Sequence, residues 1–178
     1  MPRTPLPDSA LMTERAIAGD PRVETFYFGS EPWAVEVEEE LKSGIWEEDR
    51  DLWLFLQEEE LVAGARLGFW KLDPPHRHAP FDERQRYYLV IAFGVNVPFQ
   101  GERDPGSPAP GRSYARSILA YIEAKARTRA DCVGLSLWVR VNNYRARRVY
   151  ETWGFDYDPA GPFDDEGEPT LEMKKWFA

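Results

Sequence analysis

Residues 135–155 of the chain read LSLWVRVNNYRARRVYETWGF, and this stretch decides the fold. Its first part alternates core-type residues with others, as a strand with one buried face does. The expected core positions are Leu135, Leu137 and Val139. Asn142 or Asn143 then offers a side-chain oxygen that can cap a helix. Apolar residues recur at helical spacing up to Gly154, which stands where a left-handed residue is expected to end the helix.

The same stretch contains the spaced pattern N-x-x-A-x-x-x-Y-x-x-x-G-F, formed by Asn143, Ala146, Tyr150, Gly154 and Phe155. With this pattern the sequence resembles the GNAT acyltransferases, which move an acyl group, usually acetyl, from coenzyme A to an amine. The resemblance implies that Asn143 binds near the pantetheine arm of the cofactor and that Tyr150 is the catalytic acid for the departing thiolate. A purely structural interpretation stays open, because a helix needs a cap and a core needs aromatic side chains.

The composition favours one compact domain. The chain has 178 residues, of which 43% are hydrophobic and 14% aromatic, enough for a sizeable core. No apolar run approaches the ~20 residues of a membrane-spanning helix, and Pro and Asp interrupt the first residues where a signal peptide would be apolar. We therefore expect a cytoplasmic protein with no membrane partner. Cys132 is the only cysteine, so no internal disulfide and no zinc cluster of cysteines is possible, and a buried, inert thiol is expected.

The net charge of -9 is unevenly distributed. Residues 112–148 contain nine Lys and Arg against two Asp and Glu, a net charge of +7, whereas the rest of the chain has 13 basic and 29 acidic residues, a net charge of -16. So acidic a chain repels polyanions except where its positive charge is concentrated. The basic segment therefore favours an anionic cofactor there and disfavours nucleic acid elsewhere, although basic residues that solvate helix faces explain it about equally well.

The N-terminal part predicts an arm, a strand and an acidic helix. Residues 1–21 are rich in Pro and polar groups and are interpreted as a partly ordered arm with a short helix over 13–18. Residues 23–28 alternate in the manner of a strand, and residues 29–32 supply a turn, a cap and a Pro for a following helix. The apolar stripe of that helix is expected to consist of Trp33, Val37, Leu41 and Ile45.

A hairpin and a histidine-containing loop follow. Residues 52–56 and 61–70 read as two antiparallel strands that are joined by a polar turn. The Pro-rich loop after them contains His76 and His78, the two histidines of the chain. Because no third ligand is evident nearby, no metal site is expected.

Residues 87–97 are almost continuously apolar, which predicts a central strand that is covered on both faces. By resemblance, the end of this strand and the start of the next helix bind the cofactor, and Gln100-Gly101 begins the pyrophosphate loop. Residues 102–111, rich in Gly and Pro, interrupt the motif and are interpreted as an inserted loop. Free amides and the helix dipole form an anion site at a helix start. The cofactor-binding residues implied here are Val95, Val97, Gly111, Arg112, Ser113, Tyr114, Ala115 and Arg116.

The C-terminal residues 170–176 alternate as a last strand, which by resemblance pairs antiparallel with the strand before the Tyr150 helix. The fold expected for residues 22–178 is a single α/β domain of the GNAT type. Its sheet is mixed and largely antiparallel, with two splayed central parallel strands and helices on both faces.

The function implied by the resemblance is transfer of an acetyl group from acetyl-CoA to a primary amine of a small molecule or peptide. Because an alkyl amine is mostly protonated at neutral pH, a base or a water chain is needed. Glu24, Asp82 and Glu83 are candidates that the sequence does not distinguish. The acidic composition favours cationic acceptors.

Two other interpretations stay open. A GNAT-fold protein can bind acyl-CoA or a partner without turnover. The segment Phe26-Tyr27-Phe28-Gly29 is similar to the F-x-C-G segment of tRNA-acetylating toxins of the same superfamily, but Phe28 replaces the Cys and the acidic surface disfavours RNA. A homodimer paired through aromatic strands at 26–28 and 176–177 is a further interpretation, which an ordinary core explains equally well.

Overall fold

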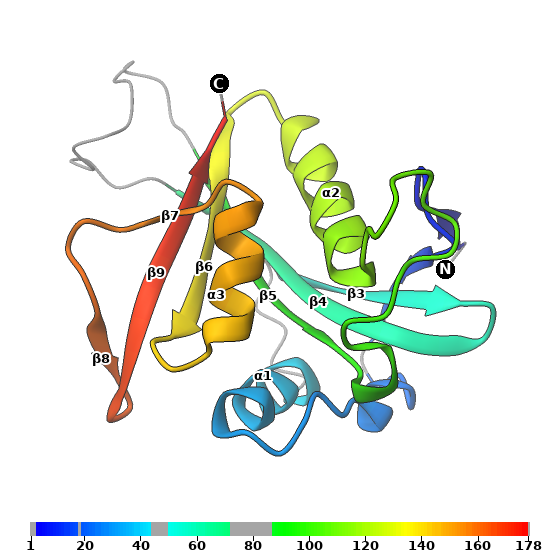
Figure 1. Cartoon of the computed structure of the whole chain (residues 1–178), viewed down its shortest axis with the longest axis horizontal. Coiled ribbons are helices and arrows are strands. Elements are labelled where there is room, and N and C mark those ends of the chain that lie inside the picture. Colours follow the sequence, from blue (N-terminus) through cyan, green and yellow to red (C-terminus); the bar gives the residue numbers. More distant parts are fainter. Residues whose placement is uncertain (1–2, 18, 44–49, 72–86, 178) are drawn as a thin grey trace. The chain divides into compact units, whose positions relative to one another are not determined.

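The computed structural model describes residues 3–17, 19–43, 50–71 and 87–177 (Figure 1). They form a single α/β domain with a mixed sheet of mostly antiparallel strands, in which β5 and β6 are a parallel pair. The strand order is β1-β2-β3-β4-β5-β6-β9-β7, and β8 also pairs with β9. The helices and strands, in chain order, are β1 (Thr4–Pro5), β2 (Met12–Arg15), η1 (Val23–Thr25), α1 (Pro32–Lys42), β3 (Arg50–Gln57), β4 (Glu60–Lys71), β5 (Tyr87–Val95), η2 (Val97–Phe99), α2 (Tyr114–Arg127), β6 (Cys132–Arg140), α3 (Tyr144–Thr152), β7 (Asp156–Tyr157), β8 (Phe163–Asp165) and β9 (Glu168–Trp176).

Contacts divide the chain into two compact units. Unit 1 consists of Met1–Leu67 and Ala92–Ile122, and unit 2 consists of Gly68–Ile91 and Glu123–Ala178. The N-terminal arm belongs to unit 1, and β4, β5 and α2 each contribute residues to both units.

The N-terminal arm of unit 1 is part of the sheet, which corrects the short helix expected over residues 13–18. Met12–Arg15 pairs antiparallel with β3 from Met12↔Leu56 to Arg15↔Trp53. Thr13 is fully buried, and its hydroxyl donates a hydrogen bond to the Leu54 carbonyl at 3.0 Å. The buried Thr13 hydroxyl is therefore satisfied by a partner far away in sequence, which local helical spacing does not reveal.

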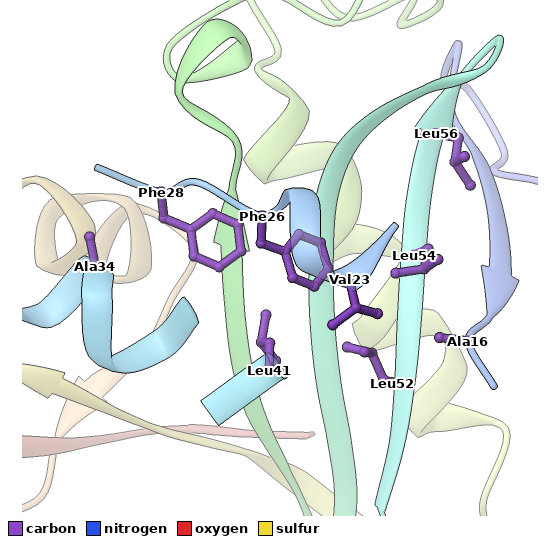
Figure 2. Close-up of a cluster of buried hydrophobic side chains, with 9 residues drawn as sticks. All are labelled: Ala16, Val23, Phe26, Phe28, Ala34, Leu41, Leu52, Leu54 and Leu56. Atoms are coloured by element: carbon purple, nitrogen blue, oxygen red, sulfur yellow. The ribbon is translucent and has the colours of Figure 1, made fainter. Parts of the chain in front are cut away.

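Unit 1 has an apolar core between α1 and one face of β3 (Figure 2). The cluster consists of Ala16, Val23, Phe26, Phe28, Ala34, Leu41, Leu52, Leu54 and Leu56, with Trp33, Val37 and Leu61 packed against it. The stripe predicted for α1 is confirmed at its first three positions, and Ile45 lies outside the described residues. Phe55 alternates onto the opposite face of β3 and contacts Tyr121 of α2, with ring centroids 5.9 Å apart. Within this unit, helices therefore cover both faces of the sheet.

Residues 23–28 do not form the predicted strand. Val23–Thr25 is a 3-10 helix, and Phe26–Phe28 continues as an extended segment outside the sheet. The rings of Phe26 and Phe28 lie side by side in the core, with centroids 5.3 Å apart (Figure 2). The alternation of apolar residues is genuine, but it serves loop packing instead of strand pairing.

Unit 2 contains the strand and helix that the opening stretch of sequence predicts. β5 and β6 pair in parallel from Tyr87↔Cys132 to Ile91↔Leu137, where the ladder ends although both strands continue. β6 then pairs antiparallel with β9 from Gly134↔Trp176 to Arg140↔Thr170, which confirms the predicted closing strand. The predicted core positions of β6, Leu135, Leu137 and Val139, are buried.

The single cysteine lies at the start of β6 and is buried. Burial raises the pKa of the Cys132 thiol above its ordinary value, and its Sγ donates to the Gly134 carbonyl at 3.4 Å. The inert thiol that the sequence predicts is therefore what the structure contains.

Candidate active site

The start of α3 in unit 2 is capped by Asn143. Its side-chain oxygen accepts a hydrogen bond from the Ala146 N–H at 3.1 Å, which satisfies one of the unpaired donors of the first helical turn. Asn143, and not Asn142, is therefore the cap. At the other end, Gly154 adopts φ +88°, as predicted for a residue that ends a helix.

Tyr150 lies in the last turn of α3 and is 8% exposed. Its ring contacts the Phe155 ring, with centroids 5.8 Å apart and an interplanar angle of 55°. Burial raises the pKa of the Tyr150 phenol well above its ordinary value of 10.0. The phenol is protonated across the neutral range, as a general acid requires, and would be so even at its ordinary pKa; the burial that raises the pKa also serves the core.

The helix start that the sequence assigns to cofactor binding lies in unit 1. Gly111 has φ +74°, and a Cβ placed there would meet no atom within 4 Å, so the backbone at this turn is open. Ser113 and Ala115 are small and only partly buried. Tyr114 is buried between partners: its ring contacts Phe99 with centroids 5.9 Å apart, and its hydroxyl donates to the Gln57 side chain. Ser113 and Ala115 are therefore small residues on either side of the buried Tyr114, and they leave room for an anion to approach the backbone N–H groups.

Arg112 supplies the clearest observation at this helix start. Its Nε is buried and has no hydrogen-bond partner within the described part of the chain, although an unsatisfied buried N–H of a cation is costly. A phosphate oxygen would satisfy it, because guanidinium groups bind phosphates with strong, charge-assisted hydrogen bonds. Arg116, two residues into the helix, is exposed. The residues present therefore fit a pyrophosphate group.

The residues at and just after the end of β5 form hydrogen bonds with β4 and with the segment that precedes α1. The Val97 N–H donates to the Tyr27 carbonyl at 2.9 Å, and the Asn96 N–H donates to the Val62 carbonyl at 2.8 Å. The Val95 carbonyl accepts a hydrogen bond from the Gln100 side chain at 2.9 Å. The Val97 N–H is therefore already occupied, so it would have to leave Tyr27 before it could polarise a substrate carbonyl.

Two side-chain amides bond the backbone near this strand end: Asn96, which sequence reasoning missed, and Gln100, which it named only as the start of the pyrophosphate loop. Asn96 accepts from the Tyr27 N–H at 2.9 Å and donates to the Leu61 carbonyl at 2.7 Å, while Gln100 also donates to the Phe28 carbonyl at 2.6 Å. The available signal was a single Asn that interrupts an apolar run, since a buried amide needs several partners.

The base for the acceptor amine is not assigned by the structure. Glu24 is exposed, whereas Asp82, Glu83, His76 and His78 lie outside the described residues. No group of three or more potential metal-ligating side chains occurs among the residues that the structure describes. Across the same residues, no helix is both long enough and apolar enough to cross a bilayer.

The fold is similar to several solved acetyltransferase structures at low sequence identity. NAA60 from Arabidopsis thaliana in complex with acetyl-CoA matches with a TM-score of 0.67 and 14% identity, covering 94% of this chain and 98% of that one. The spermidine/spermine N-acetyltransferase SpeG from Vibrio cholerae matches with a TM-score of 0.57 and 17% identity, covering 93% and 92%. The KacTA–DNA complex matches with a TM-score of 0.57 and 15% identity, covering 91% of each chain.

The sequence itself also matches a family. No curated protein matches the chain significantly. The sequence model of the acetyltransferase (GNAT) family, however, matches residues 21–155, well over half of the chain, including Gly111, Arg112, Asn143 and Tyr150. This chain therefore belongs to the GNAT acetyltransferase family.

Proposed function

We propose that the protein transfers an acetyl group from acetyl-CoA to a primary amine of a small molecule or peptide. The observation that carries the proposal is the unsatisfied Arg112 Nε beside the open turn at Gly111, in a chain of the GNAT acetyltransferase family. NAA60, which has been crystallised with acetyl-CoA, and SpeG, a polyamine N-acetyltransferase, share the fold and support the reaction class.

The cofactor would supply the acetyl group as a thioester. In this proposal the Arg112 guanidinium and the N–H groups of the first turn of α2 that follow Tyr114 bind its pyrophosphate, because a helix start presents unpaired donors and a positive dipole end. The Tyr114 N–H itself is directed at the Glu102 carbonyl. Val95, Val97 and Asn143 border the pantetheine and acetyl groups. Asn143 would do so through its side-chain NH2 group, because its side-chain oxygen already caps α3 and its backbone N–H donates to the Arg140 carbonyl.

Tyr150 acts as the general acid. Its Oη holds a proton at neutral pH, as a phenol of ordinary pKa already does, and this proton passes to the leaving sulfur as the carbon–sulfur bond breaks. The amine must lose its own proton to attack, and that proton goes to a water or to a base outside the groups described above.

The acceptor is proposed to be cationic. Residues 156–172 contain seven acidic residues and no basic residue. Beside them the rings of Trp138 and Phe163 lie in a T-shaped pair with centroids 5.2 Å apart, and Trp138 is 54% exposed. Exposed aromatic faces near carboxylates attract alkylammonium groups. The overall negative charge makes nucleic acid an unfavourable partner, although one protein of this fold is known as a DNA complex.

Calorimetric titration of acetyl-CoA tests the proposal. The double variant Ser113→Glu with Ala115→Asp adds two negative charges at the start of α2 and is expected to abolish binding, because it repels the pyrophosphate. The matched control Ala124→Asp with Ala130→Glu adds the same charge at exposed positions at and beyond the far end of the helix and is expected to bind as wild type.

If wild type and control bind and the double variant does not, the cofactor site is supported. Equal binding by all three proteins would refute the site at α2. A wild type that does not bind acetyl-CoA would refute the proposed function and favour a non-catalytic interaction domain.

A further inference from the structure

The inserted loop at 102–111 contains a buried carboxylate. Asp104 is 4% exposed, and its two oxygens accept four hydrogen bonds. Oδ1 accepts from the Ala10 N–H at 2.9 Å and from the Gly106 N–H at 3.0 Å. Oδ2 accepts from the Ser9 and Ser117 hydroxyls, each at 2.5 Å. One side chain therefore joins the N-terminal arm, the inserted loop and α2, all within unit 1.

The backbone around Asp104 folds back onto the start of α2. The Asp104 N–H donates to the Arg112 carbonyl at 2.9 Å, and an isolated antiparallel bridge joins Arg103 to Ser113. The Tyr114 N–H is directed at the Glu102 carbonyl at 3.4 Å. The inserted loop is thus bonded to three consecutive residues at the entry to the helix: Arg112 and Ser113, which precede α2, and Tyr114, its first residue.

The other side of the loop is fixed against the N-terminal arm. A Cβ at Gly106 would lie 2.2 Å from the Ala10 nitrogen and 2.4 Å from the Ser9 carbonyl carbon, so no side chain fits there. The loop therefore packs backbone to backbone on the arm, and Asp104 is bonded to both surfaces of this contact.

The chemistry of Asp104 differs from that of a structural ion pair. No basic side chain forms a salt bridge with it in the described part of the chain, and four neutral donors surround it instead. Burial alone would raise its pKa, but the hydrogen bonds from Ala10, Ser117, Ser9 and Gly106 outweigh this effect and hold the pKa of Asp104 below its ordinary value of 3.8. The group is therefore an ionised carboxylate whose short bonds fix the geometry of its donors.

We propose that Asp104 is a positioning residue for the acyl-CoA cofactor. Its carboxylate fixes the loop against the arm and Ser117, and its backbone N–H bonds the Arg112 carbonyl, so that the turn at Gly111 and the start of α2 keep the conformation that receives a pyrophosphate. This inference rests on the proposed function, since it takes the start of α2 as the phosphate site. Asp104 contacts none of the groups assigned to proton transfer, so its role concerns binding and not chemistry.

Steady-state kinetics of Asp104 variants test the inference. Asp104→Ala removes all four side-chain hydrogen bonds and is expected to raise the KM for acetyl-CoA about tenfold, because the loop then no longer holds the start of α2 in its binding conformation. The kcat is expected to change by less than about twofold. Asp104→Asn keeps an oxygen for the two N–H donors and is expected to raise KM only a few-fold. Ser117→Ala removes the bond between Asp104 and α2 and is expected to raise KM. Ser9→Ala removes one of the two bonds between Asp104 and the arm, and the bond from the Leu11 N–H within the arm, and is expected to leave KM near wild type.

Glu14→Gln is the matched control, because Glu14 is a buried carboxylate of the N-terminal arm that forms ion pairs with Arg3 and Arg22. It is expected to lower the melting temperature without a change in KM for acetyl-CoA. If Asp104→Ala does not fold, Asp104→Asn and Ser117→Ala carry the test.

Two results would overturn the inference. One is a KM that rises equally in Glu14→Gln and Asp104→Asn, which would indicate a general loss of stability. The other is a wild type that binds acetyl-CoA while Asp104→Asn and Ser117→Ala bind it equally well, which would leave the proposed function intact and remove only the role of Asp104.

Discussion

Single residues of this protein often combine a structural and a catalytic assignment. Asn143 is a helix cap whether or not it borders a cofactor, and Tyr150 is a core aromatic whether or not it is an acid. The two roles separate only when a substitution keeps one of them. Removing the hydroxyl of Tyr150 keeps the ring and its contact with Phe155, so the aromatic packing is retained while the acidic proton is lost.

Tyr150→Phe is therefore expected to lower kcat by about 10²- to 10⁴-fold, the usual contribution of a general acid, with KM for acetyl-CoA within a few-fold of wild type. Steady-state kinetics at neutral pH measure this. Tyr144→Phe is the control, because Tyr144 begins the same helix but is 71% exposed. A kcat that is equal in Tyr150→Phe and wild type would show that another group or water protonates the thiolate.

Elements of unit 2 are joined by one partly buried carboxylate. Glu123, near the end of α2, accepts hydrogen bonds from Lys175 of β9 at 2.7 Å, from Trp153 at the end of α3 at 3.0 Å and from Arg127 one turn away at 2.9 Å. Burial alone would raise its pKa, but the bonds from Lys175 and Arg127 outweigh it and hold the pKa of Glu123 below its ordinary value of 4.5.

A carboxyl group whose pKa is lower in the folded state stabilises the fold above its unfolded pKa, and this stability is lost as the pH falls through the folded pKa. Glu123→Gln is therefore expected to reduce the free energy of unfolding by about 1–3 kcal/mol at pH 7, with a difference from wild type that shrinks below pH 4.5. Urea titrations at both pH values measure it. Glu166→Gln, at an exposed turn, is the control and should not change the free energy of unfolding at either pH. If Glu123→Gln lowers the free energy of unfolding as much below pH 4.5 as at pH 7, the shape of the Glu123 side chain matters and its charge does not.

For the whole molecule, the sequence predicted the parts of the fold that local patterns determine. The strand, cap, helix and Gly154 of the opening stretch are all confirmed, because alternation, capping and left-handed backbone are local properties. The strand at Met12–Arg15 and the buried Asp104 were missed because their partners, Leu54 and Ser117 among them, are distant in sequence. The candidate site shows the same division: its residues can be named from a motif, but the hydrogen bonds that Asp104 and Asn96 make around it cannot, because they depend on distant partners.

The net charge of -9 belongs to the molecule as a whole and bears on its substrates. A cationic diamine is expected to have a KM at least several-fold lower than a neutral amine of the same length, and its KM should rise as salt increases from about 50 to 200 mM, because screening weakens attraction between exposed charges. Initial rates over a pair of such amines at two salt concentrations measure this. Equal KM values that do not respond to salt would mean that the acidic surface plays no part in acceptor choice.

The buried Cys132 bears on how such rates can be followed. Acetyl transfer releases coenzyme A with a free sulfhydryl, which chromogenic disulfide reagents detect. The protein has one cysteine, shielded from solvent and with a raised pKa, so little of it is in the reactive thiolate form. Native enzyme should therefore give almost no colour of its own, and a slow rise in background during a long assay would report unfolding of β6 instead of turnover.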